Sequence, residues 1–280
     1  SKFPNSVLNA APGNLSIAYQ LKGPVTALAV GSASGLVGMD YACQMIRNHQ
    51  AEAMIVIASD ESNEAIHMGH DKLSLLSRNG KPAGAKDADG FIHAPGSVAF
   101  VLEARDHARE RRAKIYASIS GYAVTSDDSP IAGLNTDGDS LSKAVFLAME
   151  RAGVSETDLY VTSCSGCPQF DENEANAMKI ALAKRTKVSA PQALLGHSFA
   201  SAGLYGILDA LYSFKEDKVA DMPDGDYEIA GNLKEFLYAE SNLRGSSFDF
   251  WIKSRYDIFS ALLYERGRAV CCHGHQNRSL

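Results

Sequence analysis

The segment from Val25 to His49 most constrains how this chain can fold, because a largely apolar stretch there runs through a turn of small residues into a helix. Residues 25–30 are predicted to form a strand, and the apolar spacing over 34–49 predicts a helix. Ser32 lies in the turn between them. Its side chain is therefore expected at a helix N-terminus, where proteins often place an activated nucleophile.

The chemistry open to Ser32 depends on its neighbours. A helix N-terminus can convert a cysteine thiol, with an ordinary pKa of about 8.5, to the thiolate. A serine hydroxyl instead needs an adjacent general base before it can attack. The simpler interpretation is that Ser32 is an N-cap whose side chain bonds to backbone amides.

Several further segments carry a family pattern in order along most of the chain. Together with Gly31–Ala33 they resemble the β-ketoacyl synthase family, whose members have a cysteine at the position of Ser32. The resemblance implies a layered α/β fold of the thiolase-like type, lacking about the first quarter of the usual ketosynthase chain. The supporting segments are Phe3–Asn9, Asp87–Ile92, Val101–Glu103 and Ala113–Tyr122.

Other catalytic positions of that family are altered too. Cys164 takes the place of the first of two histidines that polarise the malonyl thioester carbonyl, whereas His197 retains the second. Gln192 stands at the family's lysine position, and Pro95 replaces its buried glutamate. His197 can therefore be interpreted as a relic held by backbone contacts or as a remaining carbonyl-polarising group.

The rest of the family pattern is partly kept. Asp171 and Glu174 fit it, with one residue fewer between them and Cys164. The family's glycine-rich gating loop corresponds to Ser246–Trp251, which has no glycine, and the last core strand is expected at Phe259–Gly267.

Loss of catalytic positions on a preserved scaffold is expected of a non-catalytic partner subunit. The chain most resembles the chain-length factor of type II polyketide synthases, including pathways of aryl-polyene type. The resemblance implies a heterodimer with a catalytic ketosynthase, contact with acyl carrier protein through that complex, and no cofactor. The segment Phe3–Gly23 and the helix after Ser32 are then expected at the interface, with Tyr19 and Met39 limiting the acyl tunnel.

Two other functions remain open. The chain could be a serine-dependent acyltransferase or thioesterase in which His197 serves as the base for Ser32. It could also be a free-standing homodimer that binds acyl carrier protein or acyl-CoA without chemistry.

Composition narrows the class of protein. The chain has 280 residues, 45% of them hydrophobic and 21% charged, and no apolar run approaches the roughly 20 residues that span a bilayer. A net charge of −6 gives no basic footprint for nucleic acid. Five cysteines, an odd number in mostly core-like segments, favour a reducing compartment, so we expect a cytoplasmic protein without membrane contact.

A metal site is not expected, although cysteines and histidines recur. Cys164 and Cys167 form a Cys-x-x-Cys pair that Cys271, Cys272, His273 and His275 could complete as a zinc site. The first pair falls inside a family motif, however, and residues 268–280 read as a tail.

Hydrophobic periodicity predicts alternating strands and helices. We expect a buried strand over Met54–Ala58, a loop over Gly80–Gly90, and one ketosynthase-like domain over residues 1–267. Three further helices are predicted, at Ser140–Ala152, Asn173–Ala183 and Ala200–Phe214.

Overall fold

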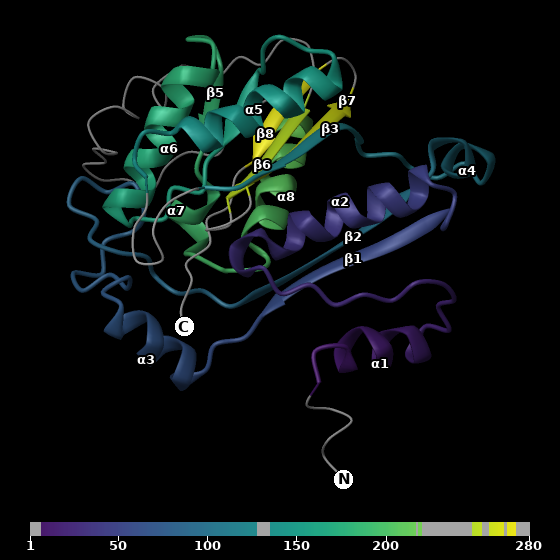
Figure 1. The fold of residues 1–280 in the computed structure, drawn as a ribbon, viewed down its shortest axis with the longest axis horizontal. Coiled ribbons are helices and arrows are strands. Elements are labelled where there is room, and N and C mark those ends of the chain that lie inside the picture. The colour runs from purple at the N-terminus through teal and green to yellow at the C-terminus, as the bar shows by residue number, and fades with distance from the viewer. Residues whose placement is uncertain are drawn as a thin grey trace.

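The computed structural model describes residues 7–127, 135–216 and 218–219, together with the backbone of three strands at 248–253, 258–265 and 268–272. Its elements stack in layers (Figure 1). Helices α2 (Ser34–Arg47) and α8 (Ala202–Glu216) lie between a two-stranded sheet and a six-stranded sheet, and α5 (Asp139–Ala152) covers the far side of the larger sheet. The α/β layering expected from the sequence is therefore present.

The smaller sheet consists of β1 (Ala53–Asp60) and β2 (Gly96–Glu103), paired antiparallel over their whole length. One face packs on α2, where Val56 and Ala58 are buried. On the other face Ile55 and Ile57 are 44% and 45% exposed. The strand predicted at Met54–Ala58 is confirmed within β1, but its predicted burial is wrong for one face, because the run of apolar residues does not reveal that only one face is covered.

The larger sheet has the order β3-β7-β8-β4-β5, and β6 pairs with β7. Strands β4 and β5 are parallel, whereas β7 runs antiparallel to β3, β6 and β8. The last core strand predicted at 259–267 is confirmed as β7, but the expected tail begins with strand β8. The bounds are β3 Ser118–Thr125, β4 Leu159–Val161, β5 Lys187–Ser189, β6 Phe248–Lys253, β7 Ile258–Glu265 and β8 Arg268–Cys272.

The four predicted helices are confirmed. Three of them differ from the prediction by at most two residues at each end, and α5 ends at Gly153, whose φ of +72° suits glycine. Helix α6 begins five residues earlier than predicted, at Pro168, because proline fits the first turn of a helix. The remaining helical elements are α1 Ala10–Ala18, η2 Gly31–Ala33, α3 Glu64–Lys72, α4 Arg105–Glu110, α6 Pro168–Ala181 and α7 Pro191–Leu195.

The predicted strand at Val25–Val30 is not formed; these residues belong to no helix or strand. Val25 is 49% exposed and Leu28 is 38% exposed. A strand exists only when its backbone groups find a partner edge, and no described strand pairs with this segment. Apolar character alone therefore predicted the wrong backbone state.

One continuous core joins the two sheets through the middle helices. It contains Leu36 from α2, Val56 from β1, Leu159 from β4 and Leu204 from α8, each less than 10% exposed. This core is consistent with the single ketosynthase-like domain expected over residues 1–267, which stays a prediction. Of the helices described, none is long and apolar enough to cross a membrane.

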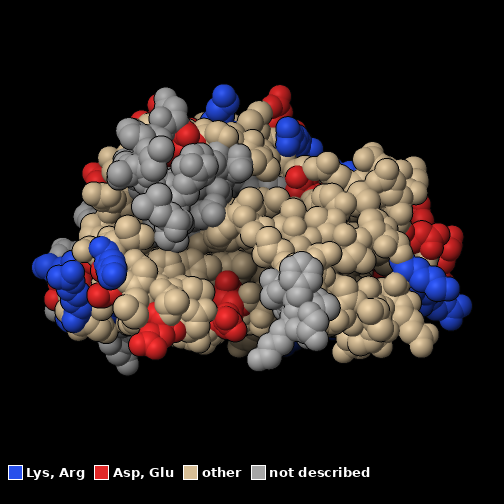
Figure 2. Space-filling view, turned by 60° about the horizontal axis from the view of Figure 1, so that its bottom comes forward, with Lys and Arg blue, Asp and Glu red and all other residues tan. Residues whose placement is uncertain are grey.

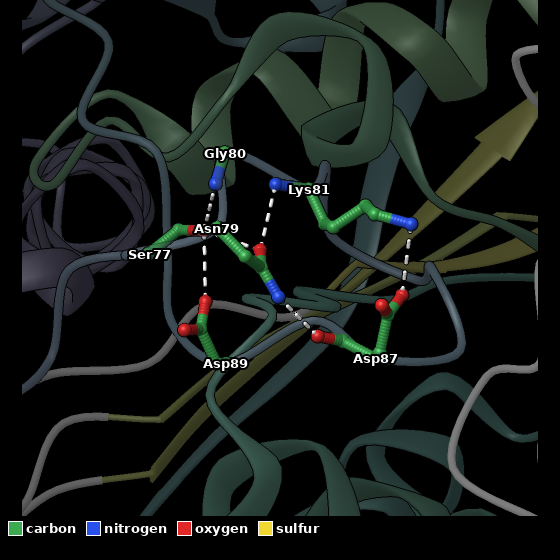
Figure 3. Close-up of polar contacts among 6 residues, drawn as sticks. All are labelled: Ser77, Asn79, Gly80, Lys81, Asp87 and Asp89. Atoms are coloured by element: carbon green, nitrogen blue, oxygen red, sulfur yellow. Dashed lines mark hydrogen bonds and ion pairs between the residues drawn. The ribbon is translucent and has the colours of Figure 1, made fainter.

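The predicted loop at 80–90 is confirmed and is held by its own polar side chains (Figure 3). Ser77 Oγ donates to Asp89 Oδ1 over 2.9 Å and accepts from the Gly80 amide over 3.1 Å. Asn79 Nδ2 donates to the Asp87 carbonyl over 2.6 Å. These contacts fix the approach to Phe91, which leads into the candidate site.

Candidate functional site

Ser32 lies in η2, immediately before α2, so the predicted strand–turn–helix position is correct for the turn and the helix. Its side chain is fully buried, and within the described part of the chain Oγ has no hydrogen-bond partner. The predicted N-cap role is wrong. Ser34 holds the turn instead, because its Oγ accepts from the Val30 amide over 2.9 Å and donates to the Gly31 carbonyl over 2.7 Å.

His197 follows α7 and is held by its backbone and its ring. Its amide donates to the Ile92 carbonyl over 2.7 Å, and its carbonyl accepts from the Ala94 amide over 3.0 Å. The chain reaches this position through Gly196, whose φ of +77° is unfavourable for other residues. Nδ1 is hydrogen-bonded to Oε1 of Gln192.

Burial, together with a smaller effect of the neighbouring His93 and His70, lowers the pKa of His197 to about 3. The imidazole is therefore neutral near pH 7. With Gln192 Oε1 facing Nδ1, the hydrogen bond favours the tautomer that carries its proton on Nδ1 and leaves Nε2 as an acceptor. To polarise a carbonyl through Nε2, the ring would need its proton on that nitrogen instead.

Cys164 is fully buried and packs against Ala83, Ala190 and Ala193. Its φ of +21° is unusual for a non-glycine residue. Burial raises the pKa of its thiol well above the ordinary value, and the carboxyl groups of nearby Asp171 and Glu174 act in the same direction. Cys164 is therefore a neutral packing residue and supplies neither a thiolate nor an imidazole-like donor.

Asp171 and Glu174, on the first turns of α6, organise the loop that carries Cys164. Glu174 accepts from the Tyr160 hydroxyl and the Ser163 hydroxyl over 2.9 and 2.7 Å. Asp171 accepts from the amides of Ser165 and Gly166 over 2.7 and 2.9 Å. Burial raises the pKa of both carboxyl groups, that of Asp171 to about 7. These retained family residues serve the shape of the loop.

Sequence reasoning missed His70 and His93. His70 stacks on Phe199 at a ring-centroid distance of 4.6 Å, and His93 lies 5.2 Å from the same ring. The ring of His197 meets Phe199 edge-on at 5.1 Å and lies 4.8 Å from Phe91. No motif marks these residues; only His93 stands in a largely apolar stretch, whereas His70 is followed by Asp71 and Lys72.

The structure brings only some of the predicted site residues together. Gln192 bonds to His197, and Cys164 packs on α7, the helix that carries Gln192. No hydrogen bond joins Ser32 to His197 in the described residues; the two segments are linked instead by the Gly35 amide, which donates to the Ala200 carbonyl over 3.1 Å. Pro95, predicted at the position of a buried glutamate, is exposed.

The two predicted tunnel residues lie in different environments. Tyr19, at the C-terminal end of α1, is 71% exposed. Met39 is 2% exposed and packs in the chain's own core.

Of the zinc candidates, Cys167 is buried and donates from Sγ to the Leu75 carbonyl over 3.3 Å. The side chains at 271–275 lie outside the described residues, and among those described no three potential ligands are grouped to hold a metal.

Family models match most of the chain. Residues 2–108 match the β-ketoacyl synthase N-terminal domain and residues 116–225 match the C-terminal domain. The chain is 32% identical over 213 residues to 3-oxoacyl-[acyl-carrier-protein] synthase 2 of Vibrio cholerae, covering 71% of this chain and 51% of that protein. It is 33% identical over 213 residues to the actinorhodin polyketide putative β-ketoacyl synthase 1 of Streptomyces coelicolor, covering 72% and 46%. The chain thus spans about half the length of these curated relatives.

Solved structures support the fold. A type II polyketide synthase ketosynthase bound to its acyl carrier protein superposes with a TM-score of 0.82 at 22% identity, covering 94% of this chain and 69% of that one. The ishigamide ketosynthase/chain length factor gives 0.79 at 17% identity, covering 93% and 66%. The thiolase-like fold implied by the sequence resemblance is confirmed, and the chain belongs to the β-ketoacyl synthase family.

Proposed function

We propose that this chain is a non-catalytic subunit, similar to a chain-length factor, that pairs with an active ketosynthase and shapes its acyl tunnel during polyketide-type chain elongation. The observation that carries the proposal is the state of the ancestral catalytic positions. Among the described residues Ser32 has no hydrogen-bonded base and is buried, Cys164 is a buried neutral thiol, and the neutral ring of His197 is engaged by Gln192.

These features disfavour condensation by the chain alone. Decarboxylative condensation needs a strong nucleophile and donors aimed at the developing enolate oxygen. Ser32 has no activating partner in the described structure, and Cys164 cannot supply the missing imidazole. The same absence of a Ser32–His197 hydrogen bond weakens the acyltransferase or thioesterase alternative.

A surface without charged side chains supports the proposal that this chain is a partner subunit. Between Lys2 and Asp40 the only charged residue is Lys22. Figure 2, which brings the α1 side of the molecule forward, shows an expanse without charged side chains to the right of the middle, while charges lie at both ends, along the upper edge and in an acidic group left of the lower middle. The apolar residues exposed in this part of the chain are Val7, Leu8, Ile17, Tyr19, Leu21, Val25 and Leu28.

Such an expanse of exposed apolar side chains marks an interaction surface. We infer that a catalytic ketosynthase covers it, because the relatives with this fold include a ketosynthase/chain length factor. Acyl carrier protein would then reach this chain through the complex, since a carrier protein binds its own ketosynthase in the solved type II assembly.

The test is co-expression with a ketosynthase that has the complete cysteine and two-histidine set, followed by size-exclusion chromatography and assay with acyl and malonyl carrier protein. We expect a 1:1 complex that condenses, and no β-ketoacyl product from this chain alone. Product from the chain alone, or a stable monomer that ignores the partner, would contradict the proposal.

A further inference from the structure

A cavity of about 670 Å³ lies away from the ancestral catalytic positions, between α2, β3 and α5. Two arginines line it, each in the last turn of its helix: Arg47 of α2 and Arg151 of α5. We call it the Arg47–Arg151 cavity. Its other lining residues are Asp40, Gln44, Ser120, Gly121, Tyr122 and Val124.

Both guanidinium groups gather around one aromatic ring. The Cζ atom of Arg47 lies 5.0 Å from the centroid of the Tyr122 ring, and that of Arg151 lies 5.9 Å from it. Arg151 is further held by a 2.5 Å hydrogen bond from Nη1 to the Tyr122 carbonyl. The two positive charges are therefore fixed within about 11 Å of each other, the sum of the two centroid distances.

The backbone of β3 is shaped around the cavity. The pairing of β3 with β7 shifts between Ile119 and Gly121, so Ser120 is a bulged residue, and it lines the cavity. A Cβ at Gly121 would lie 2.3 Å from the Ala148 carbonyl oxygen. Glycine therefore lets α5 pack directly on β3, which brings Arg151 to the cavity wall.

The charges of the cavity are not balanced. Asp40 is its only acidic lining residue, and its Oδ2 accepts from Gln44 Nε2 over 2.8 Å. Within the described residues, neither arginine has a carboxylate oxygen within ion-pair distance. Two guanidinium groups against one carboxyl leave an excess positive charge, and both arginines are exposed to solvent.

We propose that the Arg47–Arg151 cavity binds a phosphoryl group. Each guanidinium presents a planar fork of N–H donors that matches two oxygens of one oxyanion. A carboxylate is filled by a single fork, whereas a phosphoryl group has three terminal oxygens and can accept from both arginines and from the Ser120 hydroxyl together. Its negative charge is also attracted by the excess positive charge of the cavity.

The experiment is titration of the full chain with inorganic phosphate, AMP and succinate, followed by isothermal calorimetry and by the ligand-induced shift of the unfolding temperature. We expect phosphate and AMP to bind and succinate to bind at least tenfold more weakly. Equal affinity for phosphate and AMP assigns the phosphoryl group alone as the ligand, and tighter AMP binding adds a nucleoside to it. Equal binding of succinate, or no binding of any probe, would overturn the proposal.

Matched variants locate the site. Arg47→Gln and Arg151→Gln should each weaken phosphate binding about tenfold or more, since each removes charge-assisted hydrogen bonds. Lys143→Gln removes an exposed positive charge from α5 outside the cavity and should leave binding unchanged. Equal losses in all three variants would indicate nonspecific attraction and would contradict the assignment. Unfolding temperatures without ligand check that each variant is folded.

Discussion

Asp60, at the end of β1, accepts two hydrogen bonds from Ser201, one from the amide over 2.8 Å and one from Oγ over 2.6 Å. The same carboxylate accepts from the Ala200 amide over 2.8 Å. Three donors at the start of α8 are thus satisfied by a residue about 140 positions earlier in the chain. This contact fixes the segment that follows His197 against the smaller sheet.

Substituting Asp60 tests this link. Asp60→Ala leaves three donors without their acceptor, so we expect the free energy of unfolding to fall by roughly 2 kcal/mol or more. Asp60→Asn keeps an acceptor oxygen and should lose less. Urea unfolding of both variants measures the difference. Equal, negligible losses would show that the contact does not stabilise the fold.

The non-catalytic interpretation predicts that Ser32→Ala is silent in function. A buried hydroxyl without a partner carries a desolvation cost, so its removal should leave stability unchanged or raise it by about 1 kcal/mol. Turnover of a reconstituted complex with an active ketosynthase should also be unchanged. If Ser32→Ala abolished turnover without disturbing assembly, the serine acyl-transfer alternative would replace our proposal.

The buried histidine and the buried carboxyl groups make the free energy of unfolding depend on pH in opposite directions. The pKa of His197 is about 3 in the fold and about 6.5 when unfolded, so between these values the unfolded chain binds more protons and acid destabilises the protein. Asp171 and Asp209 have pKa values raised by burial to about 7 and about 6, above their unfolded values. The stability that these two carboxyl groups contribute is lost as pH rises from about 4 to about 7.

The variant His197→Phe separates these effects. It removes the acid-destabilising group and leaves the carboxyl groups, so its stability relative to wild type should improve as pH falls from about 7 to about 4. Denaturant unfolding at several pH values gives the slope, whatever the variant does to stability at neutral pH. His49→Gln, at an exposed position, is the control. A slope identical to wild type would contradict the prediction.

The sequence was most informative where a motif and a local periodicity coincide. The turn at Ser32 and the helix α2 could be predicted from small residues followed by apolar spacing. The assignment of Ser32, Cys164 and His197 to family positions stays a prediction. The contacts of those residues could not be predicted, because they depend on tertiary structure. Ser32 has no base among the described residues, and the ring of Phe91, from a distant segment, lies 4.8 Å from that of His197.

One strand prediction failed, and the burial of another strand was predicted wrongly, for a related reason. Residues 25–30 and Ile55–Ile57 are both largely apolar, yet the first segment has no partner edge among the described strands and the second is covered on one face only. A run of apolar residues indicates that the segment tends to be buried, but it does not indicate which neighbouring element will cover it. His70 and His93 were missed because isolated histidines carry no spacing that could be recognised.

The last prediction concerns Tyr19 and Met39 as limits on the acyl tunnel. An extending chain gains about 0.8 kcal/mol for each buried methylene, so a side chain that blocks the tunnel ends elongation by removing that gain. Tyr19 is exposed here, and Tyr19→Ala should lengthen the product of the reconstituted complex at little cost to stability. Met39 lies in the core, and Met39→Ala should lower the free energy of unfolding by about 2–5 kcal/mol.

Mass spectrometry of the products, with size-exclusion chromatography to verify assembly, distinguishes the two residues. Ile17→Ala, at another exposed position of α1, is a matched control for general loss of apolar surface. Longer products with Tyr19→Ala and unchanged products with Ile17→Ala would assign Tyr19 to the tunnel. Unchanged product lengths with both Tyr19→Ala and Met39→Ala, in intact complexes, would reject both positions, because a wall that limits chain length must respond when its bulk is removed.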